Sequence, residues 1–143
     1  MDFSVDVKQQ ELIDLAKTIA EKEIAPRALR IDKSGVMDEE LLKVMKESGM
    51  TQLSVPKEYG GAGIDLLTGA LISEQLSKGC AGVATICAAN SLASFPILFA
   101  GSDMQKMDLF DCLNRGGMAC FALTEPGAGS DAGAVSCRAI KYK

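Results

Sequence analysis

The residues best suited to chemistry lie close together near the end of the sequence, between Met118 and Gly133. This stretch begins with six mainly apolar residues, 118–123, and a short apolar run of this kind predicts a buried strand. A loop rich in glycine, proline and small polar residues follows. Glycines let another molecule approach the backbone closely, and the N–H groups of such a loop can point at one acceptor-rich ligand. The residues that suit this chemistry are Thr124, Gly127, Gly129, Ser130 and Asp131.

The same composition is also typical of a plain turn, and the residues alone leave both interpretations open. Two phosphate-binding patterns are excluded. Gly127, Gly129 and Gly133 do not have the G-x-G-x-x-G spacing of a dinucleotide-binding loop, and no Gly-Lys-Ser/Thr follows them as in a Walker A loop.

Three stretches together resemble one known family. Leu123 to Asp131 (LTEPGAGSD) resembles the flavin-contacting signature of the acyl-CoA dehydrogenases. Residues 55–63 (VPKEYGGAG) resemble the loop between the early helices of that family. Residues 89–92 (ANSL), followed by Pro96, resemble its central helix, which lines the acyl pocket. The resemblance runs in order over nearly the whole chain.

The resemblance implies FAD as the cofactor and an acyl-CoA thioester as the substrate. The family oxidises the α,β bond of the acyl group by proton abstraction and hydride transfer to the flavin. Thr124 suits a flavin contact, because a preorganised donor stabilises the negative charge that reduction places on the flavin. Phe121 departs from the Tyr often found at its position, which puts a polar contact in doubt. The cofactor-binding residues implied are Phe121, Leu123, Thr124, Gly129 and Ser130.

The resemblance also implies a substrate site but no catalytic base within this chain. Ser130 is expected to contact the pantetheine arm of CoA, and the acyl wall is expected at Ala88, Ala89 and Leu92. Ordinary core positions are the alternative interpretation of these three wall residues. Glu125 lies inside the signature and is not expected to be the base, which the family carries on a later segment. Glu74 is interpreted as a surface or ion-paired carboxylate.

Apolar residues at helical spacing predict about five helices before Gly117. Leu67, Ala70, Leu71 and Glu74 are expected to share a helix face, and Met104, Met107 and Phe110 are expected to pack inward. Tyr59 is either a ligand contact or an anchor for its loop on the core. The helix-capping residues predicted are Asp6, Asp38, Asp65 and Ser102.

Residues 82–100 are apolar almost all round, with Pro96 inside, and approach the length of a membrane span. The run is interrupted and lacks basic flanks and an aromatic belt. We therefore expect no membrane span here. A helix that is apolar on all sides predicts the buried centre of a bundle, with a kink or restart at Pro96.

The expected fold class is mainly α. Residues 1–117 form an N-terminal helical bundle of the acyl-CoA dehydrogenase type. Residues 118–143 form the truncated start of the middle β domain, with a second strand predicted by alternation from Val135 to Ala139. Two strands do not make a stable sheet alone, so the chain is expected to be the front of a longer protein and inactive by itself.

Composition limits the other possibilities. The net charge of −4 gives no electrostatic support for nucleic acid binding. The absence of His excludes a Ser-His-Asp or Cys-His site within this chain, and no metal is expected. The five cysteines are odd in number and lack a C-x-x-C pair, which favours reduced core thiols. The N-terminus has neither signal-peptide nor transit-peptide character, so a cytoplasmic location is expected.

The resemblance implies electron-transferring flavoprotein as the redox partner and a homotetramer when the protein is full length. One alternative from another functional class is a stand-alone, non-catalytic helical binding module derived from the same family. A reading frame that continues past Lys143 would favour the enzyme.

Overall fold

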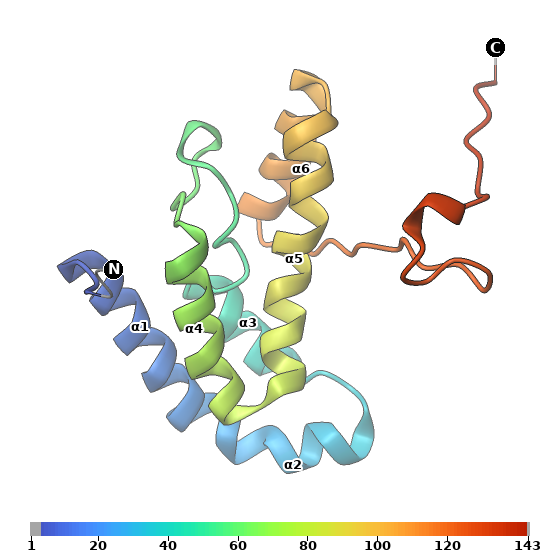
Figure 1. Ribbon diagram of the computed structural model, residues 1–143. Helices are drawn as coiled ribbons and strands as arrows, with labels where there is room; N and C mark the ends of the chain where they lie inside the picture. Colours follow the sequence, from blue (N-terminus) through green and yellow to red (C-terminus); the bar gives the residue numbers. More distant parts are fainter. Residues whose placement is uncertain (1–3, 143) are drawn as a thin grey trace.

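The computed structural model describes residues 4–142. Its helices form a bundle from which the C-terminal segment leaves as an extended chain (Figure 1). The mainly α class is therefore confirmed. The described α-helices are α1 (Val7–Ile19), α2 (Ala25–Ser34), α3 (Glu39–Glu47), α4 (Leu66–Gly79), α5 (Ala81–Ala100) and α6 (Asp103–Asn114). Short helical turns occupy Ala20–Ile24, Lys57–Tyr59 and Ala132–Ala134.

The four predicted capping residues are confirmed. Each side chain accepts a hydrogen bond from the backbone N–H three residues later: Gln9 for Asp6, Leu41 for Asp38, Thr68 for Asp65 and Gln105 for Ser102. Gln9 and Gln105 complete reciprocal capping boxes. Gln9 also donates to the Thr68 hydroxyl over 2.8 Å, which ties the start of α1 to the start of α4.

Helices α1 and α2 meet at a π-helical segment, Ala20–Ile24, and Pro26 lies in the first turn of α2. Pro is tolerated there because the first N–H groups of a helix have no intrahelical partner. The C-terminal end of α4 packs closely against the π-helical segment. A Cβ atom on Gly79 would lie 2.9 Å from both the carbonyl oxygen of Ala20 and the Cβ of Ile24.

The main core lies where α1, α3, α4 and α5 meet, and a smaller cluster lies beneath α6. The main cluster includes Ala16, Ile24, Leu41, Met45, Ile72, Leu76 and Val83. The smaller cluster consists of Val55, Phe110 and Leu113. Tyr59 packs on Phe110 with ring centroids 4.8 Å apart, which favours its role as a loop anchor.

The buried faces of α6 and α4 differ from those expected from the sequence. Phe110 is buried as expected, but Met104 and Met107 are 71% and 62% exposed, because the inward face of α6 runs through Phe110 and Leu113. Leu67, Ala70 and Glu74 do share a face of α4, but that face is exposed. The buried face carries Thr68, Ile72 and Leu76.

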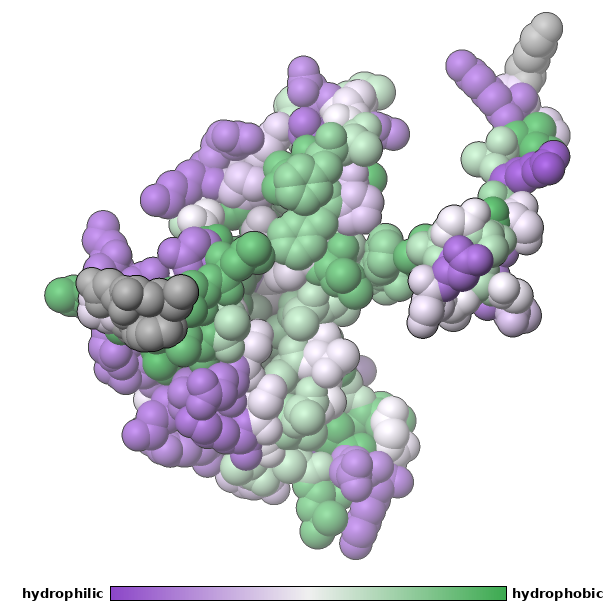
Figure 2. All heavy atoms as spheres, in the orientation of Figure 1, coloured by the Kyte–Doolittle hydropathy of each residue, from purple (hydrophilic) through white to green (hydrophobic). Residues whose placement is uncertain are grey.

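Helix α5 is buried on one side only, so the prediction of a helix buried all round is wrong. Its buried residues are Val83, Ala84, Cys87, Asn90 and Ser94. Leu92 and Phe99 on the outer side are 51% and 81% exposed, and apolar surface covers this side in Figure 2. Pro96 lies inside the helix, which continues to Ala100.

By length and composition alone, α5 is apolar enough to cross a membrane. Such a helix is weak evidence for a span, because the core helix of a soluble protein has the same composition. The inner side of α5 packs against α4 and α6 and buries polar Asn90 and Ser94. These contacts fit a core helix.

The predicted strands at 118–123 and 135–139 are not confirmed. Within the described residues, the β-type pairing is an isolated bridge between Glu125 and Ala128. A strand needs a neighbour to satisfy its backbone N–H and C=O groups, and this segment runs out from the bundle without one (Figure 1).

The five cysteines are free thiols in the structure, and the prediction that they lie in the core is only partly confirmed. Cys87 is buried, and burial raises the pKa of its thiol to about 11. Cys80 is half-buried, whereas Cys112, Cys120 and Cys137 are exposed.

Candidate cofactor and substrate site

The predicted acyl-wall residues lie on the outer side of α5. Ala88 and Leu92 are exposed, and Ala89 is half-buried. Spacings of four and seven residues place Ala88, Leu92 and Phe99 along one stripe of the helix, opposite the stripe that packs into the core. Ala88 and Leu92 are therefore not core residues in this structure. A contiguous apolar stripe on a surface is typical of a binding or packing face.

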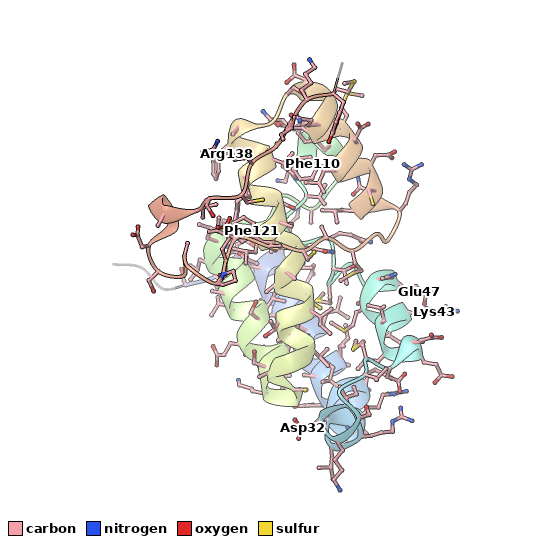
Figure 3. The ribbon with its side chains drawn as sticks, turned by 90° about the vertical axis from the view of Figure 1, so that its right-hand side faces the viewer. Asp32, Lys43, Glu47, Phe110, Phe121 and Arg138 are labelled. Carbon is pink, nitrogen blue, oxygen red and sulfur yellow. The ribbon has the colours of Figure 1, made fainter. Side chains whose placement is uncertain are left out.

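The predicted cofactor residues lie on the segment that leaves the bundle. Phe121 and Leu123 are 41% and 42% exposed, and Figure 3 labels Phe121 on this segment. Thr124, Gly129 and Ser130 are exposed as well. All five are therefore accessible to another molecule.

The loop itself is a tight turn built on residues 125–128. The backbone N–H of Glu125 donates to the carbonyl of Ala128 over 3.0 Å, and the N–H of Ala128 donates back over 3.1 Å. Pro126 holds the second position of the turn, where its fixed φ is favourable. Ala128 is only 2% exposed, although its neighbours on both sides lie at the surface.

The carboxylate of Glu125 closes the loop onto the chain that follows it. One oxygen accepts hydrogen bonds from the backbone N–H of Ser136 at 2.9 Å and from its hydroxyl at 2.8 Å. The other oxygen accepts from the N–H of Cys137 at 2.8 Å. Hydrogen bonds from the Ser136 and Cys137 backbones hold the pKa of Glu125 below its ordinary value. This arrangement supports the expectation that Glu125 is not the base, because its carboxylate is occupied in holding the loop.

The glycines of the loop leave open space around the backbone. A Cβ atom at Gly127 or Gly129 would meet no atom within 4 Å, and neither residue has a positive φ. The contrast is Gly61, where a Cβ would lie 2.0 Å from the carbonyl oxygen of Val55. Crowding inside the chain therefore explains Gly61 but neither of the two loop glycines.

The structure does not assemble the two predicted groups into one pocket. The loop lies beyond the bundle, to the right of α5 in Figure 1, whereas the acyl-wall residues lie on α5 itself. What connects them is Asn90, which is fully buried in α5. Its side chain accepts a hydrogen bond from the backbone N–H of Ala119, where the C-terminal segment leaves the bundle. Sequence reasoning missed this residue, although a polar side chain in an apolar helix was the available signal.

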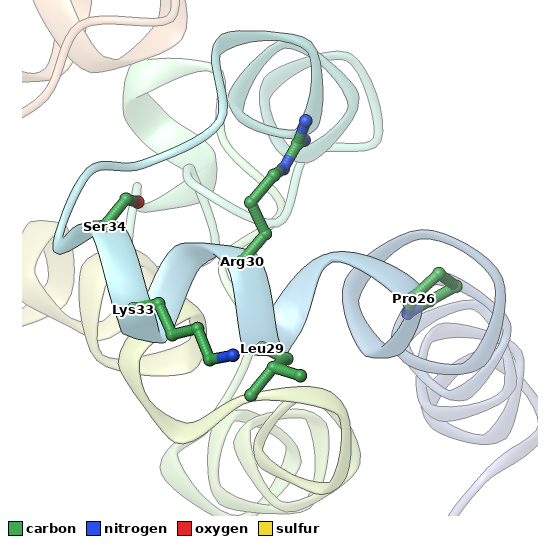
Figure 4. Close-up of a pocket in the computed structure, with 5 residues that line it drawn as sticks. All are labelled: Pro26, Leu29, Arg30, Lys33 and Ser34. Carbon is green, nitrogen blue, oxygen red and sulfur yellow. The ribbon is translucent and has the colours of Figure 1, made fainter.

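A groove lies elsewhere, along α2. It has a volume of about 640 Å³ and is lined by Pro26, Leu29, Arg30, Lys33 and Ser34 (Figure 4). Arg30 already pairs with Asp38, and none of the predicted site residues lines this groove. Within residues 4–142 there is also no cluster of three or more metal-ligating side chains.

Comparisons with known proteins agree on one family. Residues 6–117 match the family described as acyl-CoA dehydrogenase, N-terminal domain. The chain is 44% identical over 136 residues to the 3-(aryl)acrylate reductase of Clostridium sporogenes, a match that covers 92% of this chain and 36% of that protein.

Solved structures give the same result. Butyryl-CoA dehydrogenase from Megasphaera elsdenii matches with a TM-score of 0.81 and 36% identity, over 92% of this chain and 36% of that one. A chain from a structure of the electron transferring flavoprotein of Acidaminococcus fermentans matches with a TM-score of 0.84 and 38% identity, over 94% and 36%. An acyl-CoA dehydrogenase from Bacillus anthracis, complexed with FAD, matches with a TM-score of 0.77 and 32% identity, over 92% and 23%.

The chain thus spans about a third of the length of the curated relative and less than two fifths of these solved chains. The family match covers the helical bundle from the cap of α1 to the end of the α6 region. On this evidence the chain belongs to the acyl-CoA dehydrogenase family and carries its N-terminal domain.

Proposed function

We propose that this chain is the N-terminal part of a flavin-dependent acyl-CoA dehydrogenase that oxidises the α,β bond of an acyl-CoA thioester. Family membership supports the enzyme class. The observation that carries the proposal is the exposure of both predicted groups: the acyl-wall residues lie on an uncovered apolar stripe of α5, and the cofactor residues lie on an open loop. A contiguous apolar stripe on a surface is typical of a binding or packing face.

The loop residues fit FAD. Gly127 and Gly129 leave room for close approach of a ligand to the backbone, and the hydroxyl-bearing residues Thr124 and Ser130 are exposed. Phe121, Leu123, Thr124, Gly129 and Ser130 would hold the cofactor, which when bound accepts the hydride. Thr124 would donate a hydrogen bond to the charge that develops on reduction. The FAD complex of the Bacillus anthracis relative supports FAD as the cofactor.

The substrate wall is the outer side of α5. Ala88 and Ala89 are small and Leu92 is apolar, so together they offer a surface for an acyl chain. Ser130 would contact the pantetheine arm of CoA. The proton-abstracting base lies outside these 143 residues in this proposal, so the chain alone neither retains flavin well nor turns over.

Reduction of an unsaturated acyl group is the second candidate reaction. The similarity to the 3-(aryl)acrylate reductase of Clostridium sporogenes favours it. The same residues serve either direction, because the hydride moves along one path between the substrate and the cofactor.

The partners proposed are acyl-CoA and electron-transferring flavoprotein, within a homotetramer of the full-length protein in the cytoplasm. Family membership supports the substrate, and the match to a chain from the Acidaminococcus fermentans structure supports the redox partner. The alternative remains a helical binding module without catalysis.

The test is a spectral titration of the full-length protein. After purification we expect a flavin absorption band that bleaches when a saturated acyl-CoA is added without an electron acceptor. Recovery of the band on addition of an enoyl-CoA to the reduced protein would show the reverse reaction. A protein that carries no flavin and binds none when FAD is supplied would contradict the proposal and favour the binding module.

A further inference from the structure

Asn90 is a polar residue in the most apolar helix of the bundle. Its side chain is completely buried, on the inner side of α5. A buried amide without hydrogen-bond partners is costly, so its partners show what the residue does.

Both ends of the Asn90 amide are engaged by backbone groups from distant parts of the chain. The side-chain N–H₂ donates to the carbonyl oxygen of Thr51 over 2.7 Å. The side-chain oxygen accepts from the N–H of Ala119, also over 2.7 Å. The N–H₂ group is further placed 3.4 Å from the carbonyl oxygen of Gly117.

This pairing requires an amide of one fixed orientation. A flipped amide would set N–H₂ against the N–H of Ala119 and oxygen against the carbonyl of Thr51. A carboxylate satisfies only Ala119, and an apolar side chain satisfies neither. Asn at position 90 therefore matches the donor of Ala119 and the acceptor of Thr51, which lie far apart in the sequence.

Among the described residues, the hydrogen bond to Ala119 is the last one from a bundle side chain to the backbone before the cofactor loop. After Ala119, residues 120–124 are exposed, and Thr124 follows five residues later. We propose that Asn90 is a positioning residue for the flavin site: it fixes the point and direction at which the chain leaves the helical bundle and so sets where Thr124 lies relative to the wall on α5. This inference rests on the proposed function of the loop.

Ser94 provides a matched control one helical turn away. It is also buried, at 1% exposure. Its hydroxyl donates to the Asn90 carbonyl over 2.7 Å and lies 3.3 Å from the Ser54 hydroxyl. It belongs to the same buried polar group, but these contacts tie α5 to the loop at 54 and not to the C-terminal segment.

The first experiment measures amide hydrogen exchange in the 143-residue chain. In Asn90→Leu we expect the Ala119 amide to lose its protection while amides in the middle of α4 keep theirs. Ser94→Ala should leave Ala119 protected. Ala119→Pro removes the donor itself, so it leaves no amide to follow at position 119. It is measured in the second experiment, where it tests the same bond if Asn90→Leu does not fold. Protection of Ala119 that survives in Asn90→Leu would overturn the inference.

The second experiment measures FAD affinity and the visible flavin spectrum in the full-length protein. Asn90→Leu and Ala119→Pro should weaken FAD binding by about tenfold or more, which is the low end of the effect of residues that orient a direct ligand contact. Both variants should also shift the flavin absorption band. Ser94→Ala should keep the parental affinity and spectrum. The positioning role would be overturned if all three variants bound FAD as tightly as the parent while the Ala119 amide had lost its protection in Asn90→Leu. A parent protein that binds no FAD would instead overturn the proposed function, and the exchange data would still report the Asn90–Ala119 bond.

Discussion

The Glu125 carboxylate and the backbone N–H of Cys137, twelve residues apart, are joined by a hydrogen bond of 2.8 Å. With the two bonds from Ser136, it turns the predicted cofactor loop into a closed ring of chain. The loop therefore keeps its shape without neighbouring strands.

This closure predicts a dependence on pH. The pKa of Glu125 is held below its ordinary value by hydrogen bonds to the ionised form. The carboxylate therefore stabilises the loop above the ordinary Glu pKa of about 4.3, and this contribution is lost as the pH falls through the lowered pKa. NMR titration of the Ser136 and Cys137 amides should show both shifting together in that acid range. In Glu125→Gln the shift should disappear; a shift that persists would assign the titration to another group.

Thr124→Val should weaken flavin binding or slow flavin reduction in the full-length protein. Loss of one preorganised donor to developing charge typically costs about 2.7–4 kcal/mol. We expect the low end of that range or less, because a backbone N–H can share the task. Thr18→Val is the control, since Thr18 is exposed on α1 and its hydroxyl donates to the carbonyl of Asp14. Equal flavin content and equal stopped-flow reduction rates in both variants would exclude the role of Thr124.

Ala88→Phe should disfavour long acyl chains more than short ones. The added ring fills space on the outer side of α5, where Ala88 is exposed. A pocket loses about 1–3 kcal/mol per methylene of mismatch, so the effect should be graded with chain length. The comparison is kcat/KM over a series of acyl-CoAs, with Ala25→Phe on α2 as the control. If the two variants and the parent share one chain-length profile, this side of α5 is not the wall.

Two glycines of α4 should respond oppositely to the same substitution. A Cβ at Gly79 would lie 2.9 Å from the Ala20 carbonyl oxygen, so Gly79→Ala should lower the free energy of unfolding by about 1–3 kcal/mol. At Gly69 the nearest atom would be 3.7 Å away, so Gly69→Ala should raise it by up to about 1 kcal/mol. Urea unfolding of the 143-residue chain measures both. Changes of the same sign would contradict the close packing of α4 on the π-helical segment.

The sequence predicted the features that depend on neighbouring residues. The caps at Asp6, Asp38, Asp65 and Ser102 were predictable because an N-cap bonds a backbone N–H within its own first turn. Burial was less predictable, because it depends on which element lies opposite. Met104 and Met107 have helical spacing with Phe110, yet only Phe110 meets a partner in the bundle.

In the candidate site, too, local features were predictable and distant contacts were not. The signature located the loop, and its glycines predicted the open space that the structure shows around Gly129. The bond between Asn90 and Ala119 was not predictable, since it joins residues 29 positions apart and no local pattern specifies the pair. The strand at 118–123 was expected from its apolar run, but pairing requires a neighbour that local sequence does not supply.

The two sides of helix α5 differ in what a substitution affects. Substitutions at Val83 or Cys87 act on the stability of the bundle, because these side chains are buried in its core. Substitutions at Ala88 or Leu92 leave the core intact and act on whatever lies against the outer side. In the proposed site, a change in substrate preference would therefore accumulate along α5 without a loss of folding stability, so specificity and stability would be free to vary separately on one helix.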